Sequence, residues 1–314
     1  MDFTIQILGS GAAVPTLKRN PSAQFVDCLN RHILIDCAEG TQHLLRKNGV
    51  KIQKIQIILI SHLHGDHYFG LVGLISTMHL LGRTNGLTIY GPKELEQIIR
   101  MQLEVGGHRM GFDIHFEVLD TKGKIQIFED SKIKIHTFPL KHRIPTFGFL
   151  IEENSKGYNL NIPLLEEDKI PVVYYDKLKG GNDVVLDDDR LIRFKKYTTP
   201  PSATRSYAYC SDTKYDENLV SIIENVTVLY HEATFLNDMQ SRAKATYHST
   251  AREASLIAKK SKAKHLILGH FSARYHHADA HLTEARTEFD SVFSAEDGRI
   301  FSIKRDLDLK LLQE

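Results

Sequence analysis

Short runs of apolar, largely β-branched residues recur along this chain, and each run ends at a turn or a polar cluster. Runs of four to eight such residues between turn-forming residues are typical of β-strands. The runs are FTIQILG, HILIDC, IQIILIS, LTIYG, IKIHTF, FGFLIE, VTVLYHE and HLILGH. We therefore expect a strand at each of them.

Helical spacing of apolar residues appears between some of these strands. It predicts helices over residues 71–81, 93–103, 250–260 and 282–293. Pro92 suits the first turn of the second helix, and Ser249 or Thr250 suits the N-cap of the third. Strands in both halves with helices between them predict an α/β sandwich rich in sheet, rather than a purely doubly wound sheet.

Residues 154–206 depart from this pattern. They hold four of the nine prolines, the turn-rich stretch LKGGNDVVLDDDR and the basic stretch RFKKY. A long segment of weak periodicity between two strong strands is typical of an insertion or a functional arm, although a tolerated loop excursion has the same appearance.

Composition narrows the class of protein. With 314 residues, 42% hydrophobic and 25% charged, the chain has the make-up of a soluble globular protein with a substantial core. No apolar stretch approaches the ~20 residues that span a bilayer, and no export signal is visible. The three cysteines, Cys28, Cys37 and Cys210, are scattered and odd in number, which indicates a reducing cytoplasm rather than a disulfide framework.

The formal net charge is +1, so the whole chain has no general attraction for nucleic acid. A polyanionic partner would have to be held by a local patch of basic residues. The chain also has 17 histidines, and histidine is the commonest side-chain metal ligand.

The stretch HLHGDH places four potential ligands, His62, His64, Asp66 and His67, directly after a predicted strand. Gly65 allows the backbone to turn tightly between them. Histidine together with carboxylate suits Zn²⁺, with Mn²⁺ or another divalent ion as the alternative. Four ligands are too many for one catalytic zinc that keeps an open position, so the stretch suggests two ions.

Further ligands should follow other strands. His142, Asp212 and His270 each stand just past an apolar run, whereas His136 lies inside one and is expected to be a core or surface histidine. A single histidine after a strand is more often structural than metal-binding. Four strand ends that all supply the right ligand types make a histidine-rich loop the weaker interpretation.

Several motifs give the chain a family resemblance. They are LGSGAAVPTLKRNPSA, DCAEGTQ, SHLHGDHYFGLVGL, YGP, SDT, HEATF, HST and LILGHFSARY, in this order from Leu8 to Tyr275. The chain resembles the metallo-β-lactamase-fold hydrolases and, among them, the ribonuclease Z (tRNase Z) family, whose short-form members remove the 3′ trailer from precursor tRNA. HLHGDH alone identifies only the superfamily, whereas HEATF with HST is specific to this branch.

The resemblance implies an αββα sandwich of two mixed β-sheets flanked by helices. Residues 1–314 would form a single hydrolase domain, with residues 154–206 inserted as a protruding arm that grips tRNA. The arm keeps an LKGG core but lacks the family's Gly-Pro step, and its acidic residues offset its lysines. We therefore expect the tRNA affinity of the arm to depend only weakly on salt.

The resemblance also implies two Zn²⁺ ions per chain. One would be held by His62, His64 and His142. The other would be held by Asp66, His67 and His270. Asp212 would bridge both ions.

Catalytic roles are carried over in the same way. The resemblance implies that Asp66 also orients or deprotonates the attacking water. His248 of HST is the expected general acid for the leaving 3′-oxygen, and Glu232 of HEATF its acidic partner. His231 is expected to support the fold.

Lys18, Arg19 and Arg274 stand near these motifs and are expected to contact substrate phosphate, with a solvated or structural arginine as the alternative for each. Asp36 is expected to hold a turn. Short members of the family pair as homodimers, which the resemblance implies here too.

Two other functions compete with a tRNA 3′-processing endoribonuclease. One is another hydrolase of this fold that acts on small phosphodiesters, thioesters or sulfate esters. The second is a nucleic-acid-binding or scaffold protein with a degenerate metal site, which requires a missing ligand. All seven expected ligand positions are filled, so this last interpretation is weak.

Overall fold

The structure, a computed structural model, describes residues 2–107, 110–120, 122–201 and 203–313. The chain divides into two compact units. The larger comprises Met1–Glu152 and Arg205–Glu314, and the smaller comprises Glu153–Thr204.

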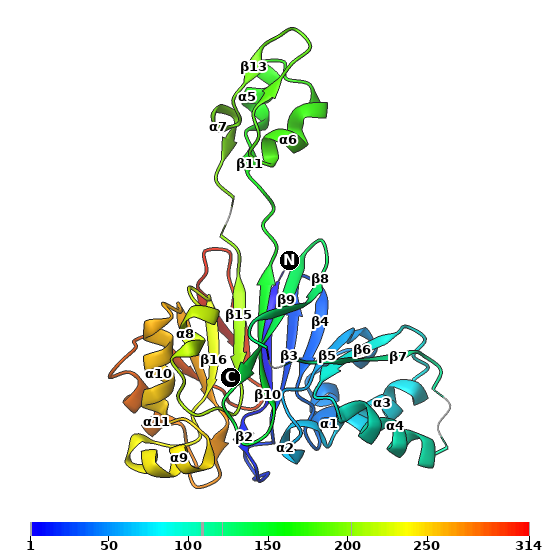
Figure 1. Cartoon of the computed structure of the whole chain (residues 1–314), viewed down its shortest axis with the longest axis vertical. Helices are drawn as coiled ribbons and strands as arrows, with labels where there is room; N and C mark the ends of the chain where they lie inside the picture. Colours follow the sequence, from blue (N-terminus) through cyan, green and yellow to red (C-terminus); the bar gives the residue numbers. More distant parts are fainter. Residues whose placement is uncertain (1, 108–109, 121, 202, 314) are drawn as a thin grey trace. The chain divides into compact units, whose positions relative to one another are not determined.

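Two mixed β-sheets form the centre of the larger unit (Figure 1). The first has the strand order β21-β20-β1-β3-β4-β5-β6-β7, and the second β19-β17-β16-β15-β10-β9-β8. The first sheet comprises β1 Phe3–Gly9, β3 Ala23–Cys28, β4 Arg31–Ile35, β5 Ile57–Leu59, β6 Leu87–Gly91, β7 Ile114–Val118, β20 Ile300–Ile303 and β21 Leu309–Gln313. The second comprises β8 Ile125–Glu129, β9 Ile133–Leu140, β10 Thr146–Glu153, β15 Ser206–Cys210, β16 Val228–Glu232, β17 His265–Gly269 and β19 Val292–Ser294. A small parallel pair joins β2 Gly11–Ala12 to β18 Phe271–Ser272.

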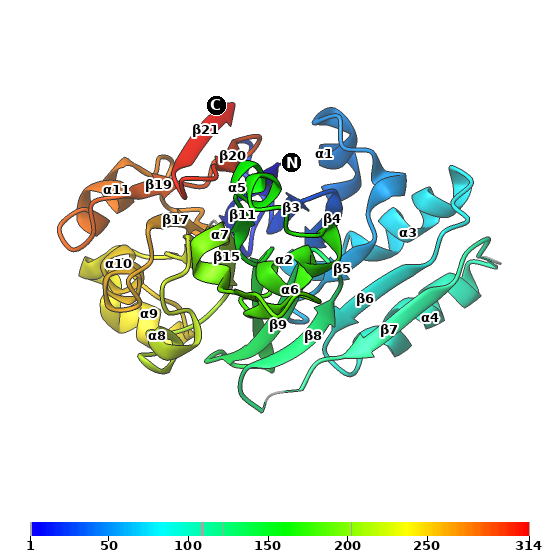
Figure 2. The same cartoon turned by 90° about the horizontal axis from the view of Figure 1, so that it is seen from above.

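Helices cover the outer face of each sheet. They are α1 Thr41–Lys47, α2 Gly65–Tyr68, α3 Leu71–Leu80, α4 Leu95–Val105, α8 Asn218–Ile222, α9 Gln240–Thr246, α10 Ala251–Lys260 and α11 Asp279–Ala285, with 3-10 turns at Ile52–Lys54 and Asn237–Met239. Figure 2 shows α3 and α4 alongside β6 and β7, and α10 and α11 alongside β17. No helix among the described residues is long and apolar enough to cross a bilayer.

The alternation of side chains along the strands explains this layering. In β10, Phe147, Phe149 and Ile151 join the core between the two sheets, whereas Leu150 joins the core beneath α8, α10 and α11. Successive side chains of a strand point to opposite faces, so a sheet that is apolar on both faces needs a layer on each side. The result confirms the predicted α/β sandwich of two mixed sheets flanked by helices.

All eight predicted strands are present. The predicted third helix begins behind Thr250, whose side chain accepts a hydrogen bond from the Glu253 backbone N–H in a capping box. The predicted helix over residues 282–293 is wrong at both ends, because the helix spans Asp279–Ala285 and Val292 belongs to β19. Val292 pairs with Leu266 of β17, and this sheet contact overrides the weak helical periodicity.

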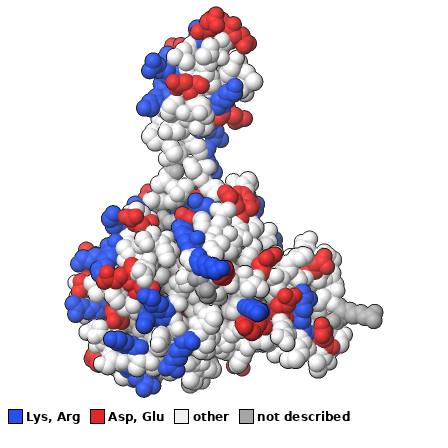
Figure 3. Space-filling view, viewed as in Figure 1, with Lys and Arg blue, Asp and Glu red and all other residues white. Residues whose placement is uncertain are grey.

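The smaller unit has a core of its own. Its elements are β11 Asn159–Leu160, α5 Ile162–Glu167, a 3-10 turn at Val172–Tyr174, α6 Tyr175–Lys179, β12 Val184–Val185, β13 Leu191–Ile192, α7 Phe194–Tyr197 and β14 Thr198–Thr199. The buried side chains are those of Leu165, Ile170, Leu178, Val184, Leu186, Ile192 and Tyr197. On the face shown in Figure 3, Lys and Arg are interspersed with Asp and Glu over this unit.

Candidate metal centre

The stretch HLHGDH leaves the end of β5 and turns into the short helix α2. His62 is fully buried, and His64 is the partly buried N-cap residue of α2. Asp66 and His67 lie in the first turn of this helix, where the His67 backbone N–H donates to the His64 carbonyl at 3.0 Å. The tight turn at Gly65 thus brings all four side chains into two adjoining clusters.

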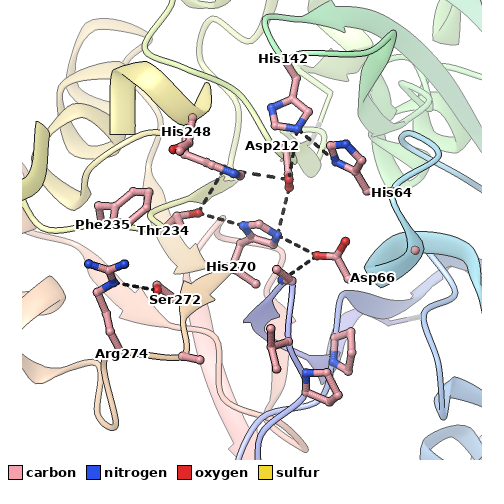
Figure 4. Close-up of a pocket in the computed structure, with 18 of the residues that line it drawn as sticks. His64, Asp66, His142, Asp212, Thr234, Phe235, His248, His270, Ser272 and Arg274 are labelled. Atoms are coloured by element: carbon pink, nitrogen blue, oxygen red, sulfur yellow. Dashed lines mark hydrogen bonds and ion pairs between the residues drawn. The ribbon is translucent and has the colours of Figure 1, made fainter. Parts of the chain in front are cut away.

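The other three predicted ligands follow strands of the second sheet. His142 comes after β9, Asp212 after β15 and His270 after β17. His270 has φ = 57°, a left-handed conformation that turns the chain sharply at the end of the strand. Both sheets therefore contribute to one group of side chains, several of which line the cavity in Figure 4.

The first cluster consists of three histidines and one carboxylate. The Nδ1 atom of His64 lies 3.0 Å from Nε2 of His62 and 3.2 Å from Nε2 of His142. The Oδ2 atom of Asp212 lies 3.7 Å from each of the same two Nε2 atoms. These four ligand atoms lie within 4.8 Å of one another.

The second cluster contains Asp66, His67 and His270. Oδ2 of Asp66 lies 3.6 Å from Nε2 of both histidines. The other oxygen of Asp212, Oδ1, lies 3.3 Å from Nε2 of His67 and 3.2 Å from Nε2 of His270. Asp212 therefore presents one carboxylate oxygen to each cluster.

These donors fit a divalent cation. Nε2 of His67 and Nε2 of His270 are buried and have no hydrogen-bond partner among the described residues. A buried polar atom without a partner carries a large desolvation penalty, which a metal bond would offset. Imidazole nitrogen and carboxylate oxygen are also the ligand types of zinc sites.

Hydrogen bonds behind the ligands orient their rings. Nδ1 of His67 lies 2.8 Å from Oδ2 of Asp36, and this carboxylate also accepts from the backbone N–H and hydroxyl of Ser61 and from the Tyr209 hydroxyl. Nδ1 of His142 donates to the Tyr247 carbonyl at 3.0 Å. In both rings the proton is held on Nδ1, which leaves the Nε2 lone pair facing the cluster.

Charge in the clusters suits cation binding as well. Burial lowers the pKa of His62, His64 and His142, so their neutral, metal-binding forms are favoured. Burial opposes ionisation of Asp66 and Asp212, but the neighbouring histidines outweigh it and hold both carboxyl pKa values below their usual range. The carboxylates are therefore ionised at neutral pH.

His67 shows the surplus of negative charge most clearly. Burial alone would lower its pKa, but Asp212, Asp36 and Asp66 outweigh burial and raise it well above the usual value. The same three carboxylates would stabilise a metal cation bound beside Nε2.

His248 and Glu232 form a separate ion pair at the edge of the clusters. Nδ1 of His248 lies 2.8 Å from Oε1 of Glu232 and 4.0 Å from Oδ2 of Asp212. Glu232 ends β16, is fully buried, and accepts from the backbone N–H groups of Thr213 and Thr234. Burial lowers the pKa of His248, but Glu232 outweighs it and raises the pKa to about 9.

A cavity of about 850 Å³ opens onto these groups. Of the three predicted phosphate contacts, Arg274 lines this cavity, where its Nε donates to the Ser272 hydroxyl at 3.1 Å. Arg19 is only 5% exposed, and its Nη1 donates to the Tyr275 carbonyl at 2.7 Å. Lys18 is exposed in the same loop and lies outside the cavity lining.

Other predicted residues have structural partners. His136 faces Glu152 at 3.2 Å, and buried His231 donates from Nδ1 to the Glu232 carbonyl at 2.7 Å. Asp36, expected to hold a turn, instead supports His67. Its partners lie 25 to 173 positions away, so no local pattern could reveal this role.

Several lining residues were not anticipated. Phe69 stands three positions after Asp66, and Arg143 directly follows His142. Their closeness in sequence to predicted ligands could have indicated that they line the cavity. Arg242 lies in α9, far from any ligand in sequence.

Known proteins resemble the chain over nearly its whole length. It is 41% identical to a ribonuclease Z of Porphyromonas gingivalis over 93% of this chain and 96% of that protein. It is 40% identical to a ribonuclease Z of Parabacteroides distasonis over 96% of this chain and 99% of that protein. The family model described as Anti-Pycsar protein Apyc1 matches residues 3–161.

Solved structures agree with these sequence matches. The crystal structure of human tRNase Z, short form, superposes with a TM-score of 0.71 at 28% identity, covering 96% of this chain and 99% of that one. The metallo-β-lactamase fold protein YhfI from Bacillus subtilis, at 17% identity and a TM-score of 0.68, shares the fold. The chain therefore belongs to the ribonuclease Z family and, over residues 3–161, to the family of the Anti-Pycsar protein Apyc1, on a metallo-β-lactamase fold.

Proposed function

We propose that this protein is a metal-dependent endoribonuclease that removes the 3′ trailer from precursor tRNA and leaves a 3′-hydroxyl on the tRNA. The observation that carries the proposal is the His248–Glu232 ion pair beside two clusters of metal ligands. Ligand clusters alone would serve many hydrolases. An added general acid suits a poor leaving group such as a ribose 3′-oxygen.

We assign two Zn²⁺ ions to the clusters, with Mn²⁺ or another divalent ion as the alternative. His62, His64 and His142 would hold one ion, Asp66, His67 and His270 the other, and Asp212 both. When bound, such ions stabilise charge on a phosphodiester and lower the pKa of water.

The side chains divide the remaining chemistry. We assign Asp66 to orienting the attacking water and taking its proton; its Oδ2 accepts the Ala13 backbone N–H at 2.7 Å, which holds the carboxylate in place. As water oxygen bonds to phosphorus, the bond from phosphorus to the 3′-oxygen breaks. His248 donates its proton to that oxygen from Nε2, because Nδ1 is held by Glu232.

Substrate contacts are assigned to the larger and smaller units separately. Arg274 is exposed on the cavity wall and suits a phosphate. The Arg19 side chain donates to the Tyr275 carbonyl, so we assign it to holding the loop that contains it. We assign Lys18, which lies outside the cavity lining, to a substrate contact outside the cavity. The inserted arm, predicted over residues 154–206, is the proposed tRNA-binding exosite, which its independent core supports.

We further propose that the enzyme is a cytoplasmic homodimer. Resemblance to short-form family members supports the dimer, and three free, buried cysteines support a reducing compartment. Sedimentation velocity on the purified protein would test the dimer.

A hydrolase acting on small phosphodiesters or thioesters is the second candidate. Residues 3–161, which match the Apyc1 family model, contain five of the seven ligands, so the ligand clusters by themselves fit either function. Glu232 and His248 lie outside that segment, and they favour the nuclease.

One assay separates the two functions. With Zn²⁺ or Mn²⁺, the purified protein should cut a 3′-extended precursor tRNA directly after the discriminator nucleotide. His248→Ala should lower the rate of this cleavage by about 10²- to 10⁴-fold while metal content stays near that of the wild type. A wild type that hydrolyses nitrophenyl diesters and never the precursor would show that the nuclease assignment is wrong.

A further inference from the structure

The cavity has an exposed aromatic side chain beside its metal ligands. Phe69 lines the cavity together with His64 and Asp66, and it is 63% exposed. Val14, 61% exposed, and Pro15 extend this apolar lining. A large aromatic side chain left in water at a catalytic cavity suggests a surface for a planar ligand.

The backbone around Phe69 is held firmly. Its N–H donates to the Gly65 carbonyl at 3.1 Å, and the next N–H, of Gly70, donates to the Cys37 carbonyl at 2.9 Å. A Cβ on Gly65 would come within 2.3 Å of the Phe69 ring, and one on Gly70 within 2.0 Å of the Ala38 carbonyl oxygen. Glycine at both positions therefore allows the ring to lie over the start of α2, three positions and one helical turn from Asp66.

The opposite wall of the cavity is cationic. In Figure 4, His248, Phe235 and Arg274 lie on one side of His270, and Asp66 lies on the other. Arg143 and Arg242 line the cavity too, and Figure 3 shows Lys and Arg gathered over the region of α9.

These arginines are available to a ligand. Within the described part of the chain, no carboxylate lies within 4.0 Å of a guanidinium nitrogen of Arg143, Arg242 or Arg274. The guanidinium of Arg274 lies over the Phe235 ring, 5.2 Å from its centroid, which steadies it without neutralising its charge.

We propose that Phe69 stacks against the base of the first trailer nucleotide, while the arginine wall binds phosphates on the tRNA side of the scissile bond. The proposal rests on the proposed function, because His248 sets the direction of the strand. The oxygen that His248 protonates stays with the tRNA, so the last tRNA nucleotide lies on the side of His248 and Arg274. The first trailer nucleotide is bonded to the same phosphorus through its own 5′-oxygen and leaves the phosphate away from His248, which allows its base to reach Phe69 beside Asp66.

Such a contact recognises a trailer without selecting its sequence. Every base has a π-face, so stacking on an aromatic side chain tolerates any nucleotide. A rigid, already exposed ring also loses little conformational freedom on binding. Phe69 would thus position whatever base follows the cleavage site.

The test is a double-mutant cycle that combines Phe69→Ala in the enzyme with an abasic first trailer nucleotide in the substrate. The quantity measured is kcat/KM for cleavage of a 3′-extended precursor tRNA. Phe69→Ala should lower kcat/KM by about 5- to 100-fold on the ordinary precursor. On a precursor whose first trailer nucleotide is abasic, wild type and variant should differ by less than about twofold, because the stacking partner is gone. Phe69→Tyr should retain wild-type rates, and Leu312→Ala, an exposed apolar residue outside the cavity, should do so as well.

Each other outcome overturns the proposal in an identifiable way. Equal rates for wild type and Phe69→Ala on the ordinary precursor exclude the stacking contact and leave the proposed function standing. A defect that persists on the abasic trailer, or that disappears only when the discriminator nucleotide is abasic, shows that the ring does not contact the trailer base. A wild type that cleaves neither precursor overturns the proposed function and this inference together. Metal content equal to wild type confirms that Phe69→Ala is folded.

Discussion

In the metal centre the charged side chains are held by the fold and are largely buried, whereas most of those in the Glu153–Thr204 unit are exposed. Asp212 is 2% exposed and Glu232 is fully buried. In the smaller unit, Lys196 pairs with Asp168 at 2.7 Å, but their side chains are 58% and 32% exposed.

This difference predicts very different responses to substitution. Removing one partner from a set of buried charges leaves the others unpaired in a medium of low dielectric, which is strongly unfavourable. Exposed ion pairs are screened by water and salt and contribute little. Chemistry should therefore be sensitive to single atoms in the centre, while the smaller unit should tolerate changes and act through its summed charge.

The largest effect should come from Asp212→Ala. This change removes a ligand atom from each cluster and leaves His67 and His270 without their shared carboxylate. We expect a loss of precursor cleavage greater than the about 10²- to 10⁴-fold typical of a missing general acid. Metal content, measured by inductively coupled plasma mass spectrometry, should fall in parallel. A variant with full metal content would contradict the shared position of Asp212.

His248→Ala should come next, with kcat about 10²- to 10⁴-fold lower. Its effect should differ in kind from that of Asp212→Ala, because His248 is expected to donate a proton and to hold no metal. Metal content and thermal unfolding should match the wild type. Loss of metal from this variant would instead indicate that His248 is a ligand, as its place near Asp212 and His270 allows.

Asp36→Asn should have an intermediate effect. The carboxylate orients His67 through Nδ1, and substitution of such a supporting group lowers metal affinity by about 10- to 100-fold. Competition with a chromogenic chelator would measure the affinity. Asp27→Asn, at a partly exposed carboxylate remote from the cavity, is the matched control and should bind metal normally.

Glu232→Gln should change the pH profile. The general acid must be protonated, so cleavage falls as pH rises through the pKa of His248, which Glu232 raises to about 9. Without the carboxylate, burial lowers that pKa, and the descending limb of kcat should move to lower pH by about one unit or more. An unmoved limb in Glu232→Gln would show that another group supplies the proton.

The ligand positions could be expected from the sequence because strand ends bring distant residues to the same edge of a sandwich. HLHGDH, His142, Asp212 and His270 each follow an apolar run, and the structure brings all of them together. A structural role for Arg19 was one of two alternatives, but its partner Tyr275 could not be foreseen, because it is 256 positions away and is reached only through folding. The last helix was misplaced for a similar reason, since pairing of Val292 with β17 outweighs local periodicity.

The smallest effect should come from the charge of the smaller unit. Nine acidic and eight basic residues lie within Glu153–Thr204, so the unit has little net attraction for phosphate. Replacing its exposed acidic run, Asp187, Asp188 and Asp189, with asparagine should tighten precursor tRNA binding by a few-fold at low salt and steepen the decline of affinity with salt. Filter binding over a range of KCl concentrations would measure both, with Asp306→Asn and Asp308→Asn in the larger unit as the matched control.

Rates of nitrophenyl diester hydrolysis should not change in the Asp187, Asp188 and Asp189 variant, because this run lies outside the metal clusters and the cavity lining. An unchanged salt dependence of tRNA binding would mean that the smaller unit does not contact the phosphate backbone of tRNA. The difference between exposed charges in this unit and buried charges in the metal centre would then bear on protein stability alone.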